Sequence, residues 1–382
     1  MSRSYDYLVV GAGSAGCVLA ARLTENPDVS VLLLEAGPSE RRPEVTVPLL
    51  FPRLFGTRRD WGYRTEPQPA LDGRRLYWPR GRMLGGSSSL NDMVWIRGHR
   101  SDYDGWAAAG ASGWSYADLL PYFQRAEDAP DGDRAYHGLG GPVRVEHNRG
   151  VLPAAHAFLR AAEQLGLAEN DDPNGERQDG AFRYPVSQRG GRRESAATAY
   201  LRPAMRRPNL TVHTGALVLG IDVQGGRATA VRWASGGREH RAVAGREVLL
   251  CAGAVGSPHI LLRSGIGPAD ELAAVGIPVV HDLPGVGNGL VDHPVVPASF
   301  RAGAGSLLDA QSVGAVARYL VRRAGPLASN VAQAGAFVAS RDGLPAPDLQ
   351  LTFGPVFLGD VGDSHVVKPT EHGVTLGAIL LR

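Results

Sequence analysis

The segment Gly11-Ala-Gly13-Ser-Ala-Gly16 is the feature that most restricts what this chain can fold into. It follows an apolar run at residues 7–10, which predicts a strand, and precedes residues 17–23, whose apolar positions recur at helical spacing. In such a turn the first glycine permits the tight bend, the second lets a pyrophosphate approach the backbone, and the third lets the helix pack on the strand. With a second buried strand at residues 30–34, the chain is predicted to open with a parallel βαβ unit.

An acidic residue stands where a dinucleotide site needs one. Glu35 lies 19 residues after Gly16, close to the spacing of about 20 at which a carboxylate hydrogen-bonds a ribose hydroxyl. A carboxylate there disfavours a 2′-phosphate, so NADP is not expected. The glycines alone are also compatible with a purely structural turn, and the motif does not separate NAD from FAD.

Composition sets further limits. The chain has 382 residues, which suggests two domains or one large α/β unit. Its 40 basic residues against 38 acidic ones give a net charge of +2, so nothing indicates nucleic acid. Cys17 and Cys251 lie in apolar segments and suggest a reduced protein. Because no apolar run reaches the roughly 18 residues of a membrane span, we expect a cytoplasmic protein without a transmembrane segment.

Other elements can be predicted along the chain. Ser115 and Asp118 form a capping-box pattern that predicts a helix to about residue 127. Residues 216–223 and 228–233 predict two strands joined by a tight turn. A buried strand at residues 247–251 is followed by Ser257 and Pro258, which predict a helix starting there and running to residue 264.

A second glycine-rich segment occupies residues 81–95, Gly-Arg-Met-Leu-Gly-Gly-Ser-Ser-Ser-Leu-Asn-Asp-Met-Val-Trp, called here the second glycine loop. Its glycines allow close backbone approach and its serines offer short donors, which suits a planar polar ring or a phosphate. From composition alone, a surface loop rich in serine and glycine is the safer interpretation.

The second glycine loop resembles the first signature of the glucose–methanol–choline (GMC) flavin oxidoreductases, and residues 253–267 resemble their second signature. Residues 283–287 and the triplet Asp292-His293-Pro294 also fit that family. The resemblance runs from about residue 7 to residue 294, and residues 96–99 place it nearest the choline-dehydrogenase-like branch.

The resemblance implies an α/β fold with a Rossmann-like FAD-binding domain and a second, substrate-binding domain built on an antiparallel sheet. We expect residues 1–145 and 192–295 to form the FAD-binding domain, and residues 146–191 and 296–382 to form an incomplete substrate-binding domain. The family binds FAD lengthwise. By resemblance, the cofactor-binding residues are Gly11, Gly13, Ser14, Ala15 and Gly16 at the pyrophosphate; Glu35 and Ala36 at the ribose; Met83, Gly86, Asn91, Asp92, Met93 and Val94 along the flavin; and Val218, Ala252 and Gly253 around the adenine end.

The implied activity is oxidation of a primary or secondary alcohol, with hydride passing to flavin N5 and electrons then passing to O₂ or a quinone-like carrier. The family's base is a C-terminal histidine that we expect beyond Arg382, so no catalytic residue and no metal site are predicted in this chain, and His293 is expected to be structural. Two alternatives stay open: an FAD-containing lyase that does not use the flavin's redox chemistry, and a catalytically silent fragment or flavin-binding protein. Trp61, Trp95 and Phe353 are candidates for the substrate pocket, although packing is the commoner role of such residues.

Departures from the family pattern refine these expectations. Choline-oxidising members carry a glutamate where this chain has Val295, so choline is a poor substrate candidate. Asp92 replaces a common glycine; its carboxylate either disfavours an anionic reduced flavin by like-charge repulsion or points into solvent. Some members attach FAD covalently to a histidine where this chain has Leu90, so noncovalent FAD is expected.

Acid precipitation of the FAD-loaded protein should therefore release all of the flavin into the supernatant, because Leu90 offers no nucleophilic atom for a covalent bond. The measurement is the flavin absorbance of supernatant and pellet. Flavin retained in the pellet would refute this prediction.

Overall fold

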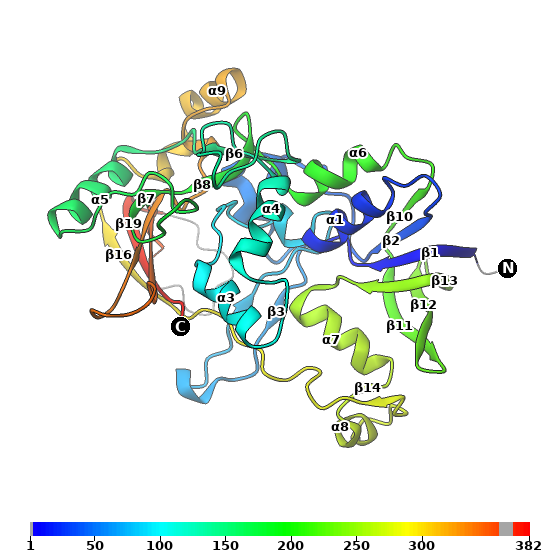
Figure 1. Ribbon diagram of the computed structural model, residues 1–382. Coiled ribbons are helices and arrows are strands. Elements are labelled where there is room, and N and C mark those ends of the chain that lie inside the picture. The colour runs from blue at the N-terminus through cyan, green and yellow to red at the C-terminus, as the bar shows by residue number, and fades with distance from the viewer. Residues whose placement is uncertain (1–2, 359–369) are drawn as a thin grey trace.

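The computed structural model describes residues 3–358 and 370–382. Residues 3–35 and 210–250 contribute the strands of a six-stranded sheet in the order β10-β2-β1-β13-β12-β11, on the right in Figure 1. The first four strands in this order are parallel, and β12 and β11 follow as an antiparallel hairpin. The strands are β1 (Arg3–Val10), β2 (Val31–Glu35), β10 (Leu210–Thr214), β11 (Leu217–Gln224), β12 (Arg227–Ser235) and β13 (Arg238–Leu250).

Both faces of this sheet are buried, which explains why β2 reads as an unbroken apolar run. On one face, Val9, Val31 and Leu33 pack against α1 (Ser14–Leu23) and against the helical turns η4 (Ala197–Leu201) and α6 (Arg202–Ala204). On the other face, Leu32 and Leu34 pack against the hairpin and against α7 (Gly253–Arg263). The predicted βαβ opening and the predicted hairpin are confirmed.

A second sheet lies at the other end of the molecule, on the left in Figure 1, with the order β16-β19-β18-β17-β7. All its neighbouring strands are antiparallel. Helix α5 (Pro153–Gln164) covers one face, where Phe158 stacks on Phe353 at 5.1 Å between ring centroids. The strands are β7 (Gly180–Arg183), β16 (Val295–Arg301), β17 (Ala334–Val338), β18 (Leu349–Gly354) and β19 (Gly373–Leu380).

Two strands connect this second sheet to the second glycine loop. β8 (Pro185–Arg189) follows β7 after a single residue and pairs with β6 (Val143–His147) and β9 (Arg192–Arg193). Val94 forms an isolated bridge with Val186, and the Trp95 N–H donates to the Pro185 carbonyl at 2.9 Å. Strand β8 therefore joins the second sheet, through β7, to the second glycine loop.

Shorter elements complete the fold. The remaining helices and helical turns are α2 (Pro43–Thr46), η1 (Pro48–Leu54), η2 (Pro69–Leu71), η3 (Gly86–Ser89), α3 (Arg100–Ala108), α4 (Tyr116–Ala126), α8 (Ala269–Ala274), η5 (Leu307–Gln311), α9 (Val313–Arg322) and η6 (Pro326–Ala328). The remaining strands are β3 (Tyr63–Arg64), β4 (Tyr77–Trp78), β5 (Glu127–Asp128), β14 (Ile266–Gly267) and β15 (His281–Asp282).

One predicted helix start is confirmed and one is wrong. Ser115 and Asp118 form a reciprocal capping box at the start of α4, as predicted. Helix α7 begins at Gly253 instead of at Pro258. The Ser257 hydroxyl does not cap a helix there but accepts the backbone N–H of Ala252 at 3.1 Å from within the first turns of α7.

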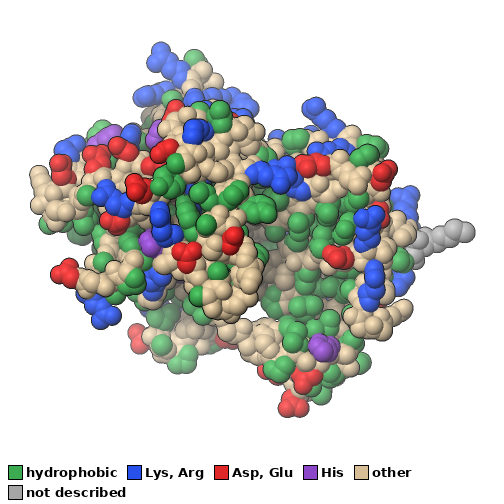
Figure 2. Space-filling model, in the orientation of Figure 1, with side chains coloured by type: hydrophobic (Ala, Val, Ile, Leu, Met, Phe, Trp, Pro, Cys, Tyr) green, Lys and Arg blue, Asp and Glu red, His purple; other side chains and the backbone are tan. Residues whose placement is uncertain are grey.

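The surface matches the near-neutral composition. In Figure 2 the acidic and basic side chains are interspersed over the visible face, without a field of one sign. In the described ranges 3–358 and 370–382, no helix is long and apolar enough to cross a membrane.

A buried network of charges anchors the start of β5. The Glu127 carboxylate is 0% exposed. It accepts hydrogen bonds from the Arg97 guanidinium at 2.7 Å, from His137 Nδ1 at 2.9 Å and from Trp95 Nε1 at 2.9 Å. His137 Nε2 lies 2.8 Å from the Asp172 carboxylate. Burial alone would lower the pKa of His137, but hydrogen bonds to Asp172 and Glu127 raise it to about 9.

Because the folded pKa of His137 lies above the roughly 6.5 of an unfolded chain, its contribution to stability is complete below about pH 6.5 and is lost as the pH rises through about 9. We expect His137→Gln to lower the free energy of unfolding by on the order of 3 kcal/mol at pH 6 and by much less at pH 9.5. Urea titrations across this range measure the difference. His147→Gln, at an exposed site on β6, is the control; an H137Q effect that does not change with pH would contradict the assignment.

Candidate cofactor-binding site

A cavity of about 680 Å³ opens at the carboxyl ends of the parallel strands β1, β2 and β13. This edge of a parallel sheet is where α/β proteins bind ligands, because the loops leave the strands there and helix N-termini point toward it. Ten of the predicted cofactor-binding residues line it: Gly11, Gly13, Ser14, Ala15, Glu35, Ala36, Gly86, Val218, Ala252 and Gly253.

Each glycine of the first motif has the environment that its predicted role requires. Gly11 has φ +95°, and a Cβ there would lie 2.6 Å from the Cys251 carbonyl oxygen. A Cβ on Gly16 would overlap the carbonyl oxygen of Gly11, so only glycine lets α1 come this close to the turn. Gly13 differs: a Cβ added there would meet only the Cys251 carbonyl oxygen, 3.9 Å away, and would face open space in the cavity.

The glycine turn at residues 11–16, called here the first glycine loop, touches the second glycine loop at this point. The Gly85 N–H donates to the Ala12 carbonyl at 2.7 Å. Gly86 has φ +52°, and a Cβ on it would lie 2.7 Å from the Cα of Gly13. Backbone therefore packs directly on backbone, and residues about 70 positions apart in the sequence form one wall of the cavity.

The N-terminus of α1 also faces the cavity. Gly13 is its N-cap residue, and no side chain caps the helix. The first N–H groups of a helix have no partner within it, and together with the helix dipole they attract anions. The uncapped end and the open space beside Gly13 thus fit a pyrophosphate.

Glu35 lies at the end of β2 and is only 6% exposed. Its carboxylate accepts the N–H groups of Ala12 at 2.9 Å and Gly37 at 2.8 Å, which fixes its orientation in the cavity wall. Burial raises the pKa of Glu35, and the two backbone donors and the nearby Arg82 oppose that rise. A carboxylate held in this way retains lone pairs for a ribose hydroxyl.

Six predicted residues do not line the cavity: Gly16, Met83, Asn91, Asp92, Met93 and Val94. Met83 and Met93 are fully buried. Asn91 is exposed and Asp92 is half-buried, so the Asp92 carboxylate does not simply point into solvent. Burial raises its pKa, while the positive charge of Arg193 opposes the rise. For these residues, contact with the cofactor stays a prediction.

The structure adds residues that the sequence did not assign. Trp61 and Tyr63 line the cavity and stack with rings 5.8 Å apart and nearly parallel. Of the three substrate-pocket candidates, Trp61 lines this cavity, whereas Trp95 is hydrogen-bonded to Glu127 and Phe353 is packed in the core of the second sheet. Arg193 is buried beside the second glycine loop. No spacing pattern links these positions to the motifs, so sequence reasoning had no signal for them.

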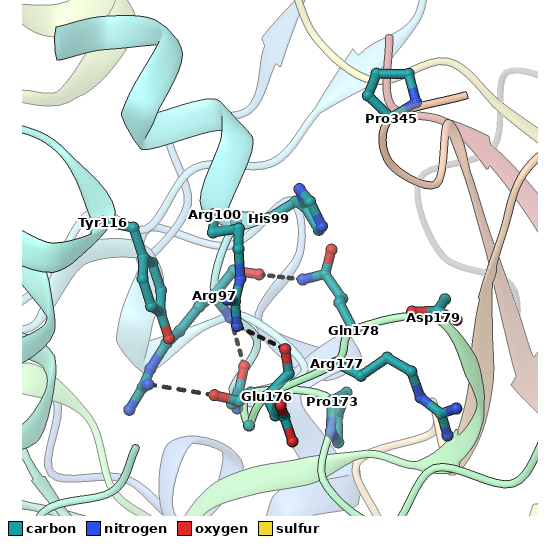
Figure 3. A pocket seen from close by; sticks show the side chains of 13 residues that line it. Arg97, His99, Arg100, Tyr116, Pro173, Glu176, Arg177, Gln178, Asp179 and Pro345 are labelled. Atoms are coloured by element: carbon teal, nitrogen blue, oxygen red, sulfur yellow. Dashed lines mark hydrogen bonds between the residues drawn. The ribbon is translucent and has the colours of Figure 1, made fainter. Parts of the chain in front are cut away.

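A second, more polar cavity of about 320 Å³ lies between the start of α3 and the loop of residues 173–179 (Figure 3). Arg100 donates to the Glu176 carbonyl at 2.5 Å, and its guanidinium lies 5.3 Å from the Tyr116 ring centroid. His99 caps α3 by accepting the Ser101 N–H at 3.2 Å. The hydrogen-bonding groups of this cavity are thus largely engaged with one another.

Comparison with known proteins identifies the family. The family model described as GMC oxidoreductase matches residues 5–295. The chain belongs to the GMC oxidoreductases. The expectation drawn from its signatures is therefore confirmed, as is the α/β fold of FAD-binding members.

Three family members illustrate the relationship. An uncharacterised GMC-type oxidoreductase of Mycobacterium tuberculosis is 46% identical over 388 residues, covering 100% of this chain and 72% of that protein. Human mitochondrial choline dehydrogenase is 44% identical over 374 residues, covering 94% of this chain and 62% of that protein. A structure of Aspergillus oryzae formate oxidase, studied for FAD modification, superposes with a TM-score of 0.89 at 27% identity and covers 100% of this chain and 73% of its own.

FAD is the cofactor of this family, and the residues present fit it. The uncapped helix, the open space at Gly13 and the buried carboxylate of Glu35 suit a dinucleotide. Leu90 is 4% exposed and packs with Val45 and Leu54, so this GMC oxidoreductase has an apolar side chain where a covalent attachment would be made.

We expect Gly16→Ala to abolish FAD binding, because its Cβ would overlap the Gly11 carbonyl and push α1 away from the turn. Quenching of FAD fluorescence on titration with protein measures the affinity. Gly105→Ala is the matched control, since Gly105 is an exposed glycine within α3 whose Cβ meets nothing within 4 Å. That control should bind FAD normally and gain about 0.5–1 kcal/mol of stability. Normal FAD affinity in G16A would contradict the packing role.

Proposed function

We propose that this protein is an FAD-dependent enzyme that oxidises a primary or secondary alcohol. The observation that carries the proposal is the cavity at the ends of β1, β2 and β13, where both glycine loops and Glu35 line a space that suits a dinucleotide, in a chain of the GMC family. Choline dehydrogenase and formate oxidase, to which the chain is similar, support an oxidation as the reaction.

The roles proposed for individual residues follow from their positions. The N–H groups at the start of α1 and the open approach at Gly13 would hold the pyrophosphate, and Glu35 would bind the ribose. The backbone around Val218 and Ala252 would contact the adenine end. When bound, the flavin supplies an acceptor, its N5 atom, for the hydride of the alcohol.

The division into domains supports the same function. We propose that residues 1–145 and 192–295 bind FAD and that residues 146–191 and 296–382 contribute to the substrate side. In support, β7 in the segment 146–191 pairs with β17 in the segment 296–382. The linking strand β8 is hydrogen-bonded to the second glycine loop, which brings the second sheet next to the proposed flavin site.

The substrate is proposed to be an uncharged alcohol. A quaternary ammonium is held by a carboxylate or by aromatic faces, and Val295 at the start of β16 provides neither. O₂ or a quinone-like carrier would take the electrons, and the cytoplasm is the proposed compartment. No described residue is given the role of proton acceptor in this proposal.

Anaerobic reduction tests the function. The FAD-loaded chain is mixed with a panel of primary and secondary alcohols, with and without added imidazole, and the visible flavin absorbance is followed. We expect at least one alcohol to bleach the flavin slowly, and imidazole to accelerate the bleaching because it can accept the hydroxyl proton.

The methyl ether of each alcohol is the control, because it has no hydroxyl proton to remove and should leave the flavin oxidised. If no alcohol bleaches the flavin under any of these conditions, while dithionite reduces it, alcohol oxidation is wrong for this chain. A redox-silent role, such as a lyase, would then be favoured.

A further inference from the structure

The second glycine loop contains a strained turn near its end, beyond Gly86 and Ser87, which line the cavity. Met93 has φ +64°, which is unfavourable for a residue with a side chain, and its own side chain is fully buried. The Asn91 Oδ1 accepts the Met93 N–H at 3.1 Å and so closes the turn from inside. Such a conformation persists only when its surroundings hold it.

The strands β8 and β9 provide part of this restraint. The Ser187 N–H donates to the Met93 carbonyl at 2.9 Å, and the Gln188 amide lies 3.7 Å from the Met93 sulfur. Residues Met93 to Trp95 therefore run along β8 as if they were a further strand. These contacts hold the end of the loop but not its middle, which includes Ser88 and Asn91.

Arg193, on β9, holds the middle. Its side chain is 4% exposed, and its guanidinium donates to the Ser88 carbonyl at 3.1 Å, the Asn91 Oδ1 at 2.7 Å and the Asn91 carbonyl at 2.5 Å. Its Nε donates to the Val45 carbonyl at 2.9 Å, which ties the loop to α2. One side chain thus satisfies acceptors on two segments that have no regular pairing with each other.

The same side chain brings a buried positive charge to the loop. Burial lowers the pKa of Arg193 to about 9, and the charge of Asp92, next to Asn91, acts in the opposite direction. Around neutral pH the guanidinium is still protonated, so a positive charge lies within one hydrogen bond of Asn91. The charge of the Asp92 carboxylate acts against this positive charge.

We propose that Arg193 is a positioning residue for the flavin: it holds Ser88 and Asn91 of the second glycine loop in the conformation that receives the ring, and its charge favours flavin reduction. This inference rests on the proposed cofactor site. Asp92 acts against Arg193, so the two side chains set the reduction potential in opposite directions.

The test compares FAD affinity and flavin midpoint potential in the wild-type chain, Arg193→Met, Arg193→Lys and Asp92→Asn. Met fills similar space but offers no donors, so we expect R193M to weaken FAD binding at least tenfold and to lower the potential. R193K should recover part of both losses, because it keeps the charge and some of the hydrogen bonds. D92N should raise the potential.

Arg192→Met is the matched control, because Arg192 is the exposed neighbour on the same short strand, and it should behave as wild type. If R193M does not fold, Asn91→Ala decides, since it removes the Asn91 Oδ1 that accepts from Arg193 and from the Met93 N–H, and it should weaken FAD binding in the same direction.

Wild-type affinity and potential in R193M, equal losses in R192M, or unchanged affinity in N91A when R193M does not fold would each overturn the role of Arg193 while the cofactor site itself stands. A wild-type chain that does not bind FAD would instead overturn the cofactor site and, with it, this inference. The two failures are therefore distinguishable.

Discussion

The cavity depends on one contact, the packing of the two glycine loops on each other. The Gly85 N–H bonded to the Ala12 carbonyl, and Gly86 seated on Gly13, bring the turn after β1 and the second glycine loop into one wall. Neither loop is a regular element that could hold its own shape. Each supports the other, with β8 and Arg193 also holding the second, and the uncapped start of α1 and the buried Glu35 face the same space.

Strand β8 connects the second sheet to this wall of the cavity. β7 pairs with β17 in the sheet, and after Tyr184 the chain continues as β8, which is hydrogen-bonded to Met93 and Trp95. The Tyr184 N–H also donates to the carbonyl of Gln333, the residue before β17, so the connection between β7 and β8 is itself hydrogen-bonded to the sheet. A shift of this sheet would therefore be transmitted to the loop that we propose to hold the flavin.

Sequence reasoning succeeded where the determining interactions are local. The strand, turn and helix around Gly11 and Gly16 follow from spacing and from the absence of a Cβ, and the capping box at Ser115 involves residues three apart. It failed at α7, because Ser257 and Pro258 form a typical helix start, whereas the helix begins earlier, at Gly253. The Ser257 hydroxyl is used within α7 instead.

The site residues that were missed depend on contacts between distant parts of the chain. Arg193 meets Asn91 across 102 positions, and neither its neighbours nor its spacing distinguish it from Arg192, which is exposed. Trp61 and Tyr63 reach the cavity from a segment that reads as irregular, because its course is set by tertiary contacts and not by periodicity. Burial and hydrogen bonding, which the sequence does not encode locally, separate the two arginines.

The atoms that crowd these glycines have a consequence for how the sequence can change over time. A Cβ on Gly11, Gly16, Gly81 or Gly86 would lie within 3 Å of a backbone carbonyl oxygen or Cα, so the nearest obstacle is backbone and not a side chain. A clash with a side chain can be relieved by a second substitution at the neighbouring position, but every residue type carries the same backbone atoms. No second substitution can therefore make room for a side chain at these positions. Across related chains we expect each of them to remain glycine, without covariation with neighbouring positions.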